Sequence, residues 1–159
     1  MIGLGTSRTH DVAMSDEALQ PLREVLQTLV NGGASLVDTA PSYGRAEAVC
    51  GALVAEDDMR KKTFLASKVS SSGRAAGERQ ITASFAAQRT DAIDLMQVHN
   101  LQDTETQLQL LRELKEQGKV RYIGSSSYSA GQIVEAQWTS RDRGLERLRH
   151  RAAAVLDPR

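Results

Sequence analysis

The chain has 159 residues, with 20 Lys plus Arg balanced by 20 Asp plus Glu, so it has the size of one domain and no basic excess for binding nucleic acid or anionic membranes. Aromatic residues make up only 4%, which argues against a base-stacking surface. The single cysteine, Cys50, excludes an internal disulfide. Since no apolar run approaches the roughly 20 residues of a membrane span and no secretory leader is visible, we expect a cytoplasmic protein.

Short apolar runs typical of strands recur along the chain, each followed by a turn or a helical pattern. They cover residues 1–5, 35–38, 63–68, 93–99 and 120–125. Strands alternate with helices in this way when a parallel sheet is covered by helices. The two architectures to consider are an open doubly wound sheet and a (β/α) barrel.

Helical patterns fill the intervals between these runs. Apolar residues at positions 22, 25, 26, 29 and 30 share one helix face, with Pro21 expected in the first turn and Gly32-Gly33 at the end. Weaker patterns predict helices over 47–54 and 81–89. A further helix is expected between an N-cap at Asp103 and a stop at Gly118, and a capping-box pair, Ser129 and Gln132, opens the last one.

The first strand is followed by a turn that lacks a glycine-rich phosphate loop. Gly3-Leu4-Gly5-Thr6 leads into a polar segment with no third glycine and no immediate helix. A dinucleotide-binding doubly wound sheet usually carries such a loop at this point. The segment is therefore a poor dinucleotide fingerprint, and both architectures remain open at this point.

Polar side chains stand where successive strand-like runs end. The runs terminate in Asp38, Lys68, His99 and the hydroxyl cluster Ser125–Ser127. The carboxyl ends of parallel strands form the active face of α/β folds, so an acid, a base, an imidazole and hydroxyls are expected to meet there. Tyr43 follows Asp38 across a short turn that can bring its phenol back over the same face.

At these residues the chain resembles the aldo-keto reductase family. The resemblance covers about residues 2–136 and rests on Asp38–Gly44 (DTAPSYG) with Ala46-Glu47 and Gly51, on Ala66–Lys68 (ASK), on Ile93–Asn100 (IDLMQVHN), and on Gly118–Gly124 (GKVRYIG) with Ser126. It implies a (β/α)8 barrel. It also implies reversible, NADPH-dependent reduction of small aldehydes and ketones.

The resemblance assigns roles that make chemical sense for carbonyl reduction. Tyr43 would supply the proton, and because a free phenol has a pKa of about 10, a neighbouring cation is needed to lower it. Lys68 would be that cation, and Asp38 would keep it charged and oriented. His99, with Asn100 beside it, would bind the substrate, so the developing alkoxide would lie between Tyr43 and His99.

The resemblance also implies which residues contact NADPH. Gly5 and Thr6 match the position beside the nicotinamide ribose, and Asp38 belongs to the same set. Ser126-Ser127 stand where the family has a Ser-Asn pair for the carboxamide, and Ser127 departs from that pattern because it is shorter and lacks an amide. No metal is expected, since His10, His99 and His150 show no ligand spacing.

Each of these residues also has a purely structural interpretation. Asp38 alone is compatible with a turn or a helix cap, Lys68 with a solvated strand end, and His99 with a hydrogen-bonded core histidine. Tyr43 could pack against its turn. Cys50 lies on the apolar side of a helix, where we expect a small, buried and unreactive thiol.

The length conflicts with a complete barrel, which normally needs about 250 residues. Five strands predict a partial, unclosed (β/α)8 barrel over residues 1–138, with two exposed edges through which the chain could form homo-oligomers. Residues 139–159 form a divergent, Arg-rich tail, either an amphipathic helix or the product of a frameshift or truncation. We therefore expect weak NADPH binding and slow or absent turnover.

Two alternatives to a reductase remain open. One is a noncatalytic fragment or interaction subunit that pairs its open strand edges with another chain. The other is an open α/β binding domain in which Tyr43 has no chemical role.

Overall fold

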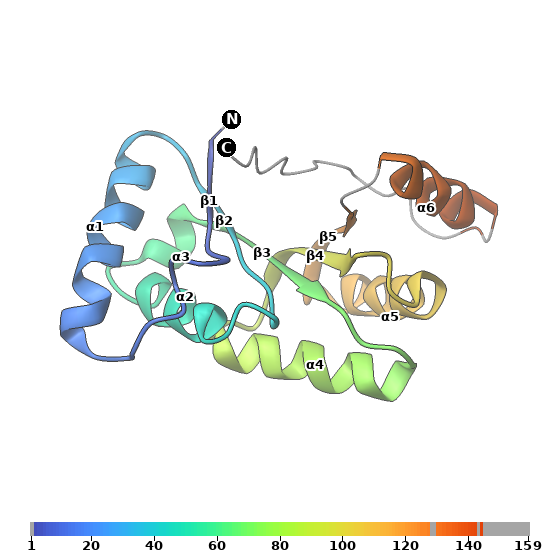
Figure 1. Cartoon of the computed structure of the whole chain (residues 1–159), viewed down its shortest axis with the longest axis horizontal. Helices are drawn as coiled ribbons and strands as arrows, with labels where there is room; N and C mark the ends of the chain where they lie inside the picture. Colours follow the sequence, from blue (N-terminus) through green and yellow to red (C-terminus); the bar gives the residue numbers. More distant parts are fainter. Residues whose placement is uncertain (1, 128–129, 143, 145–159) are drawn as a thin grey trace.

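The computed structural model describes residues 2–127, 130–142 and 144, and within them five parallel strands form one sheet in the order β1-β2-β3-β4-β5 (Figure 1). Each strand pairs with its neighbour in sequence, so every connection crosses over the sheet to the adjacent strand. The strands are β1 (Gly3–Gly5), β2 (Leu36–Asp38), β3 (Phe64–Val69), β4 (Ile93–His99) and β5 (Val120–Ser126).

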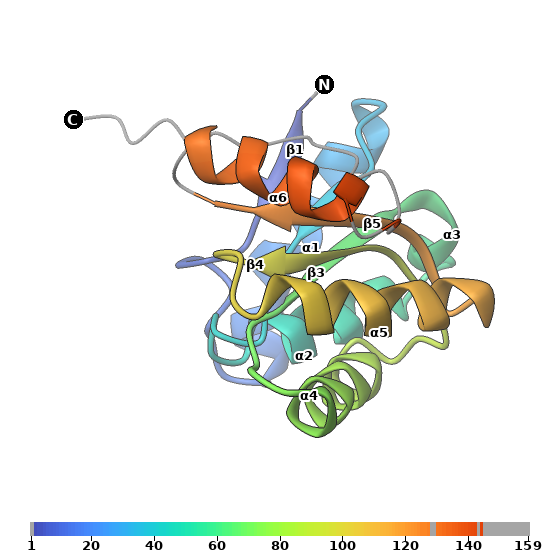
Figure 2. The ribbon, with the colours of Figure 1, turned by 90° about the vertical axis from the view of Figure 1, so that its right-hand side faces the viewer.

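Helices occupy the connections between the strands. Figure 2 shows α4 and α5 next to one another on the same side of β3 and β4, while α6 lies next to β5. The helices are α1 (Asp16–Asn31), α2 (Ala46–Val54), α3 (Met59–Lys62), α4 (Arg74–Ala87), α5 (Thr104–Glu116) and α6 (Ala130–Asp142). Within the described part of the chain, no helix combines the length and the apolar character needed to cross a membrane.

The strand order decides between the two architectures that the sequence left open. A doubly wound sheet reverses its strand order at a switch point, whereas here the order follows the sequence throughout. Among the described residues β1 pairs only with β2 and β5 only with β4, so the two edges do not meet. The expectation of a partial, unclosed barrel is confirmed.

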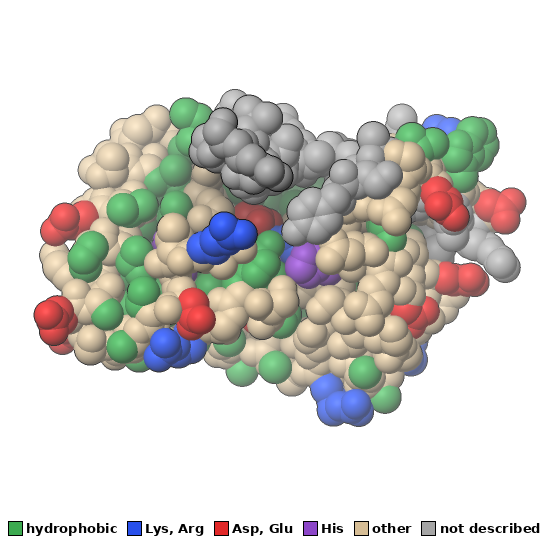
Figure 3. All heavy atoms as spheres, viewed as in Figure 1, with side chains coloured by type: hydrophobic (Ala, Val, Ile, Leu, Met, Phe, Trp, Pro, Cys, Tyr) green, Lys and Arg blue, Asp and Glu red, His purple; other side chains and the backbone are tan. Residues whose placement is uncertain are grey.

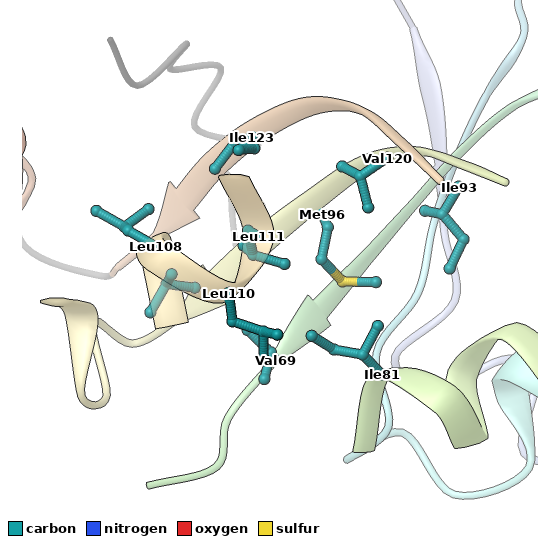
Figure 4. Packing of buried hydrophobic residues seen from close by; sticks show 10 residues of the cluster. Val69, Ile81, Ile93, Met96, Leu108, Leu110, Leu111, Val120 and Ile123 are labelled. Atoms are coloured by element: carbon teal, nitrogen blue, oxygen red, sulfur yellow. The ribbon is translucent and has the colours of Figure 1, made fainter. Parts of the chain in front are cut away.

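The core lies between the sheet and the helices, in two hydrophobic clusters. One cluster joins α1 and α2 to β2 and β3, with Val37 and Leu65 at its centre. Figure 4 shows the other, in which α4 and α5 pack on β3, β4 and β5. Its labelled residues are Val69, Ile81, Ile93, Met96, Leu108, Leu110, Leu111, Val120 and Ile123. Burying a leucine or isoleucine side chain contributes about 1.5–3 kcal/mol, so these clusters hold the helices on the sheet.

Helix starts differ from the sequence expectations in two places. Ser15 caps α1 by accepting a hydrogen bond from the Ala18 N–H at 3.4 Å, so Pro21 is inside the helix and its expected place in the first turn is wrong. The apolar stripe marks only the buried face, whereas the cap sets the start. Likewise, α4 begins at Arg74, well before the expected residue 81. The sequence pattern missed this start because the first turns consist of small and polar residues without an apolar stripe.

The predicted caps of α5 and α6 and the predicted tail have different outcomes. Asp103 does occupy the N-cap of α5, but its carboxylate accepts the N–H of Gly73, the N-cap of α4, at 2.7 Å and makes no capping bond. Gly118 follows the end of α5 with φ +73, as expected for a helix stop. Ser129 and residues 145–159 lie outside the described residues, so neither the capping box nor most of the tail is described.

Candidate active site

The register of the sheet brings the polar strand ends to one edge. Asp38 pairs with Gly5 of β1, Lys68 pairs with Gln97 of β4, and His99 pairs with Ser126 of β5. The strands are parallel, so their carboxyl ends lie on the same side of the sheet. The expected meeting of acid, base, imidazole and hydroxyl is therefore a property of the fold.

Lys68 is buried and forms an ion pair with Asp38, which is partly exposed. The Lys68 Nζ lies 2.7 Å from Asp38 Oδ2 and also donates a hydrogen bond to the Thr39 carbonyl at 2.8 Å. Only 4% of Lys68 is exposed, and this burial lowers its pKa, whereas the charge of Asp38 opposes that shift. The ammonium is thus held at a fixed point by two acceptors on one side.

Gln97 completes the environment of Asp38 and was missed in the sequence. Its Nε2 donates to Asp38 Oδ1 at 3.3 Å, so the two carboxylate oxygens have separate donors. Residues 97 and 99 are two positions apart in one strand, so their side chains lie on the same face of the sheet. This spacing is the one signal in the sequence that could have placed Gln97 at the site. The Thr39 carbonyl was also missed, because a backbone acceptor leaves no trace in residue type.

Tyr43 reaches this edge from the turn after β2. Its N–H donates to the Ala40 carbonyl at 3.0 Å, which closes the turn. Lys68 Nζ lies 5.1 Å from the centroid of the Tyr43 ring, and the His99 ring meets the Tyr43 ring edge-on, with centroids 6.2 Å apart and an interplanar angle of 88°. All four residues proposed for the chemistry are therefore brought together.

The turn that carries Tyr43 is fastened to the segment between β1 and α1. Asp11 Oδ1 accepts hydrogen bonds from the backbone N–H and the Nε of Arg45, each at 3.1 Å. Gly44 has φ +62, and a Cβ there would come within 2.4 Å of the Asp11 carboxylate. The positive φ favours glycine at this position, and a side chain there would displace the Asp11 carboxylate from Arg45.

His99 is half-buried beside the lysine. Burial lowers its pKa, the positive charge of Lys68 lowers it further, and the charge of Asp38 acts in the opposite direction. At neutral pH the imidazole is therefore uncharged and can donate one hydrogen bond. Asn100, which was expected to act with His99 on the substrate, is exposed and has a left-handed backbone with φ +52.

The residues expected to contact a cofactor lie around the same edge. Thr6 is buried, and both its N–H and its hydroxyl donate to the Asp38 carbonyl, at 3.1 and 3.0 Å. Ser126 Oγ is buried and has no hydrogen-bond partner among the described residues. A buried hydroxyl without a partner is costly, so it fits the polar group of a ligand. The hydroxyl of Ser127 instead donates to Gln132 Oε1 at 2.6 Å.

Other chemistry is less well supported by the described residues. No group of three His, Cys, Asp or Glu side chains in this part of the chain is arranged to hold a metal ion. Charged side chains of both signs are interspersed over the face in Figure 3. Burial, aided by the charge of Glu47, raises the pKa of Cys50 to about 12, so the expectation of a buried, unreactive thiol is supported.

Comparisons with known proteins point to one family. The family model described as "Aldo/keto reductase family" matches residues 1–149. The aldo-keto reductase YhdN of Bacillus subtilis (strain 168) is 30% identical over 147 residues, a match that covers 83% of this chain and 44% of YhdN.

Solved structures that resemble this chain include members of the same family. An aldo-keto reductase from Klebsiella pneumoniae in complex with NADPH superposes with a TM-score of 0.74 at 26% identity, and one from the same organism with NADP and acetate superposes with 0.73 at 27%. Each match covers 86% of this chain and 48% of the other. The chain thus spans about half the length of the relatives it matches.

Proposed function

Because this chain belongs to the aldo/keto reductase family, we propose that it carries the catalytic half of an NADPH-dependent reductase of small aldehydes and ketones. The observation that supports this proposal most directly is the position of one buried cation. Lys68 is held by Asp38 at 2.7 Å and lies 5.1 Å from the ring of Tyr43, whose other neighbour is His99. A cation, a phenol and an imidazole in this arrangement suit proton donation to a carbonyl oxygen.

Tyr43 is the proposed proton donor. An ordinary phenol has a pKa of about 10 and is a poor acid at neutral pH. The Lys68 ammonium favours the phenolate, so the proton can pass from Tyr43 Oη to the carbonyl oxygen as the C–O bond becomes that of an alcohol. Asp38 and the Thr39 carbonyl keep the ammonium in place while the phenolate forms.

His99 is the proposed orienting group. An uncharged imidazole donates a hydrogen bond to the substrate oxygen without competing as an acid with Tyr43. Negative charge that develops on that oxygen would then be shared between His99 and Tyr43, as in an oxyanion hole. Asn100, exposed next to His99, is proposed to contact the remainder of the substrate.

NADPH, when bound, supplies the hydride to the carbonyl carbon. The residues proposed to hold its nicotinamide half are Gly5, Thr6, Asp38, Ser126 and Ser127. The hydroxyl of Ser126, which is buried and has no hydrogen-bond partner in the described part of the chain, supports this assignment. The hydroxyl of Thr6 is already used by the Asp38 carbonyl, so Thr6 would shape the site rather than donate to the cofactor.

The strength of cofactor binding is a separate part of the proposal. In the described residues the sheet ends at β5, and the Klebsiella reductases are about twice as long as the matched part. Hydride transfer demands accurate positioning, so we propose that these 159 residues by themselves bind NADPH weakly and turn over slowly or not at all.

The tail is proposed to be distinct from the catalytic part. We place the boundary near residue 138 and retain both interpretations of residues 139–159, a native helix or a frameshifted segment. Translation of the gene in its other two frames beyond this point separates them. A strand-like continuation in another frame supports the frameshift, and its absence removes that hypothesis. A cytoplasmic location remains part of the proposal.

A second candidate function is an interaction subunit without catalysis. Among the described residues the edges of β1 and β5 are unpaired, and α6 beside β5 exposes Val134 and Trp138, at 50% and 64%. Unpaired parallel edges favour association with a second copy or with another chain. Native mass measured together with NADPH titration separates the candidates. An obligate oligomer that does not respond to NADPH favours the subunit, and a monomer that binds NADPH favours the reductase.

The proposed function is tested by NADPH fluorescence and by the rate at which an aromatic aldehyde oxidises saturating NADPH. Tyr43→Phe should lower that rate by about 10²–10⁴-fold with little change in NADPH affinity, because general acid catalysis contributes that much. Tyr122→Phe is the matched control, since its ring stacks on Phe64 away from the site. Where the wild type has a measurable rate, an equal rate in Tyr43→Phe would contradict the assignment.

A further inference from the structure

Glu47 is a buried carboxylate that the proposed chemistry does not use. It lies in the first turn of α2 and is 6% exposed. Burying a charged group is costly unless it is well hydrogen-bonded. The hydrogen bonds of Glu47 must therefore offset the cost of its burial.

The partners of Glu47 are neutral and come from two other elements. Oε1 accepts hydrogen bonds from Ser67 Oγ of β3 at 2.6 Å and from the Gln88 amide, next to the end of α4, at 3.0 Å. Oε2 accepts one from Ser84 Oγ of α4 at 3.2 Å. Figure 1 shows α2 and α4 close together beneath the strands, which places this cluster between the helices and β3.

Two site residues lie immediately next to this cluster along the chain. Ser67 precedes Lys68 in β3, and successive strand residues face opposite sides of the sheet. The Ser67 hydroxyl therefore bonds Glu47 on the side of the strand opposite to the lysine side chain. Glu47 follows Tyr43 by one helical turn, and the Tyr43 carbonyl accepts the Ala46 N–H at 3.2 Å. The shortest bond of the cluster therefore ties the Tyr43 turn to the Lys68 strand.

We propose that Glu47 is a positioning residue that sets the separation between Tyr43 and Lys68 through its hydrogen bond to Ser67. The inference rests on the proposed function, because it assigns Glu47 to the same proton-donating site. Arg45, the N-cap of α2, makes no side-chain capping bond, and its contact with Asp11 ties the turn to the segment between β1 and α1 and not to β3. Burial lowers the pKa of Lys68, and the charge of Glu47, like that of Asp38, opposes this shift. The Glu47 carboxylate therefore helps to keep Lys68 charged.

The readout is the titration of the Tyr43 phenol, which requires neither cofactor nor turnover. The chain has three tyrosines, so the double variant Tyr122→Phe/Tyr128→Phe leaves Tyr43 as the phenol that titrates. Its ultraviolet phenolate absorbance is followed against pH, with circular dichroism to define the range in which the fold persists. At an effective dielectric constant of about 20, each ångström of added separation from Lys68 raises the midpoint by roughly half a pH unit.

Two serines provide a matched pair of variants. Ser67→Ala and Ser84→Ala each remove one fully buried hydroxyl from the same carboxylate. We expect Ser67→Ala to raise the Tyr43 midpoint and Ser84→Ala to leave it unchanged, because α4 carries none of the proposed site residues. If both variants lower the unfolding midpoint but neither moves the phenol, Glu47 is merely structural and the inference fails.

Variants of Glu47 itself separate hydrogen bonding from charge. Glu47→Gln can keep all three bonds, with its oxygen accepting from Ser67 and Gln88 and its amide donating to Ser84 Oγ. The Tyr43 midpoint should then stay at or below the wild-type value. Glu47→Met keeps the volume and loses the bonds, so the midpoint should rise. A rise of equal size in both variants would overturn the inference, and if Glu47→Met does not fold, the serine pair decides.

Lys68→Met distinguishes this inference from the proposed function. If Lys68→Met leaves the Tyr43 midpoint unchanged, the lysine does not tune the phenol and the proposed function fails with the inference. If Lys68→Met raises the midpoint and Ser67→Ala does not, the proposed function stands and the role of Glu47 is refuted.

Discussion

Two cation–carboxylate pairs lie at opposite ends of the same sheet and use the same kinds of groups differently. At the carboxyl end, Lys68 pairs with Asp38 at 2.7 Å. At the amino end, Arg60 pairs with Asp94 at 3.0 Å and also donates to the carbonyls of Thr63 and Ala92, at 3.1 and 2.9 Å. Arg60 thereby joins the segments that precede β3 and β4.

The difference between the pairs shows how one sheet separates stability from chemistry. The planar guanidinium of Arg60 has its donors directed at several acceptors, and Asp94 in addition accepts the Leu65 N–H at 3.0 Å. Lys68 is a compact charge with two acceptors and an aromatic ring beside it. The amino end therefore holds strands together, whereas the carboxyl end holds a charge next to a phenol.

The largest effect is expected when the carboxyl-end cation is removed. Lys68→Met deprives Tyr43 of the charge that favours its phenolate, so the rate at which an aromatic aldehyde oxidises saturating NADPH should fall by about 100-fold or more. Stopped-flow or long-time absorbance of NADPH measures that rate. If the wild type has a measurable rate and Lys68→Met has the same rate, the two ends of the sheet do not differ in their part in the chemistry.

Removal of Arg60, the cation at the amino end, should lower the stability of the fold and leave the rate of NADPH oxidation unchanged. Arg60→Met removes the ion pair with Asp94 and the hydrogen bonds to the Thr63 and Ala92 carbonyls, so the free energy of unfolding should decrease by about 2 kcal/mol. Urea unfolding measures the decrease, and Arg79→Met on the exposed side of α4 is the control. Where the fold remains intact, the NADPH oxidation rate should be that of the wild type, and a large fall in that rate would contradict the comparison.

Gln97 should have a smaller effect, since it supports the carboxylate and not the cation. Gln97→Leu removes the donor to Asp38 Oδ1 and should lower the free energy of unfolding by about 1 kcal/mol. Urea unfolding provides the measurement. If Gln97→Leu proved as damaging to the NADPH oxidation rate as Lys68→Met, the amide would have a direct part in the chemistry.

The smallest expected effect is a shift in the titration of His99. Its folded-state pKa is lowered by burial and by Lys68, so the unfolded state binds more protons between that pKa and the ordinary value of about 6.5. The contribution of His99 to stability is therefore lost as pH falls through this interval. Lys68→Met should raise the pKa of His99, which NMR of the imidazole ring detects. An unchanged or lower pKa would show that the two groups are not coupled.

Most of the site could be predicted from the sequence because its residues end strands. Asp38, Lys68 and His99 each follow an apolar run, and in a parallel sheet the ends of such runs meet at one edge. The place of Tyr43 followed from the short turn after Asp38. Helix starts were predicted less well, as Pro21 and the start of α4 show, because an apolar stripe marks a buried face and not a cap.

By itself, the sequence determined the alternation of strands and helices, the family resemblance and the residues at the strand ends, because these depend on local patterns and on motifs. Only the tertiary structure decided that Gln97 binds Asp38, that the Thr39 carbonyl shares Lys68 and that Glu47 joins α2 to β3. These contacts link residues 20 to 59 positions apart. They depend on register and packing, which bring together groups whose identities alone do not reveal their partners.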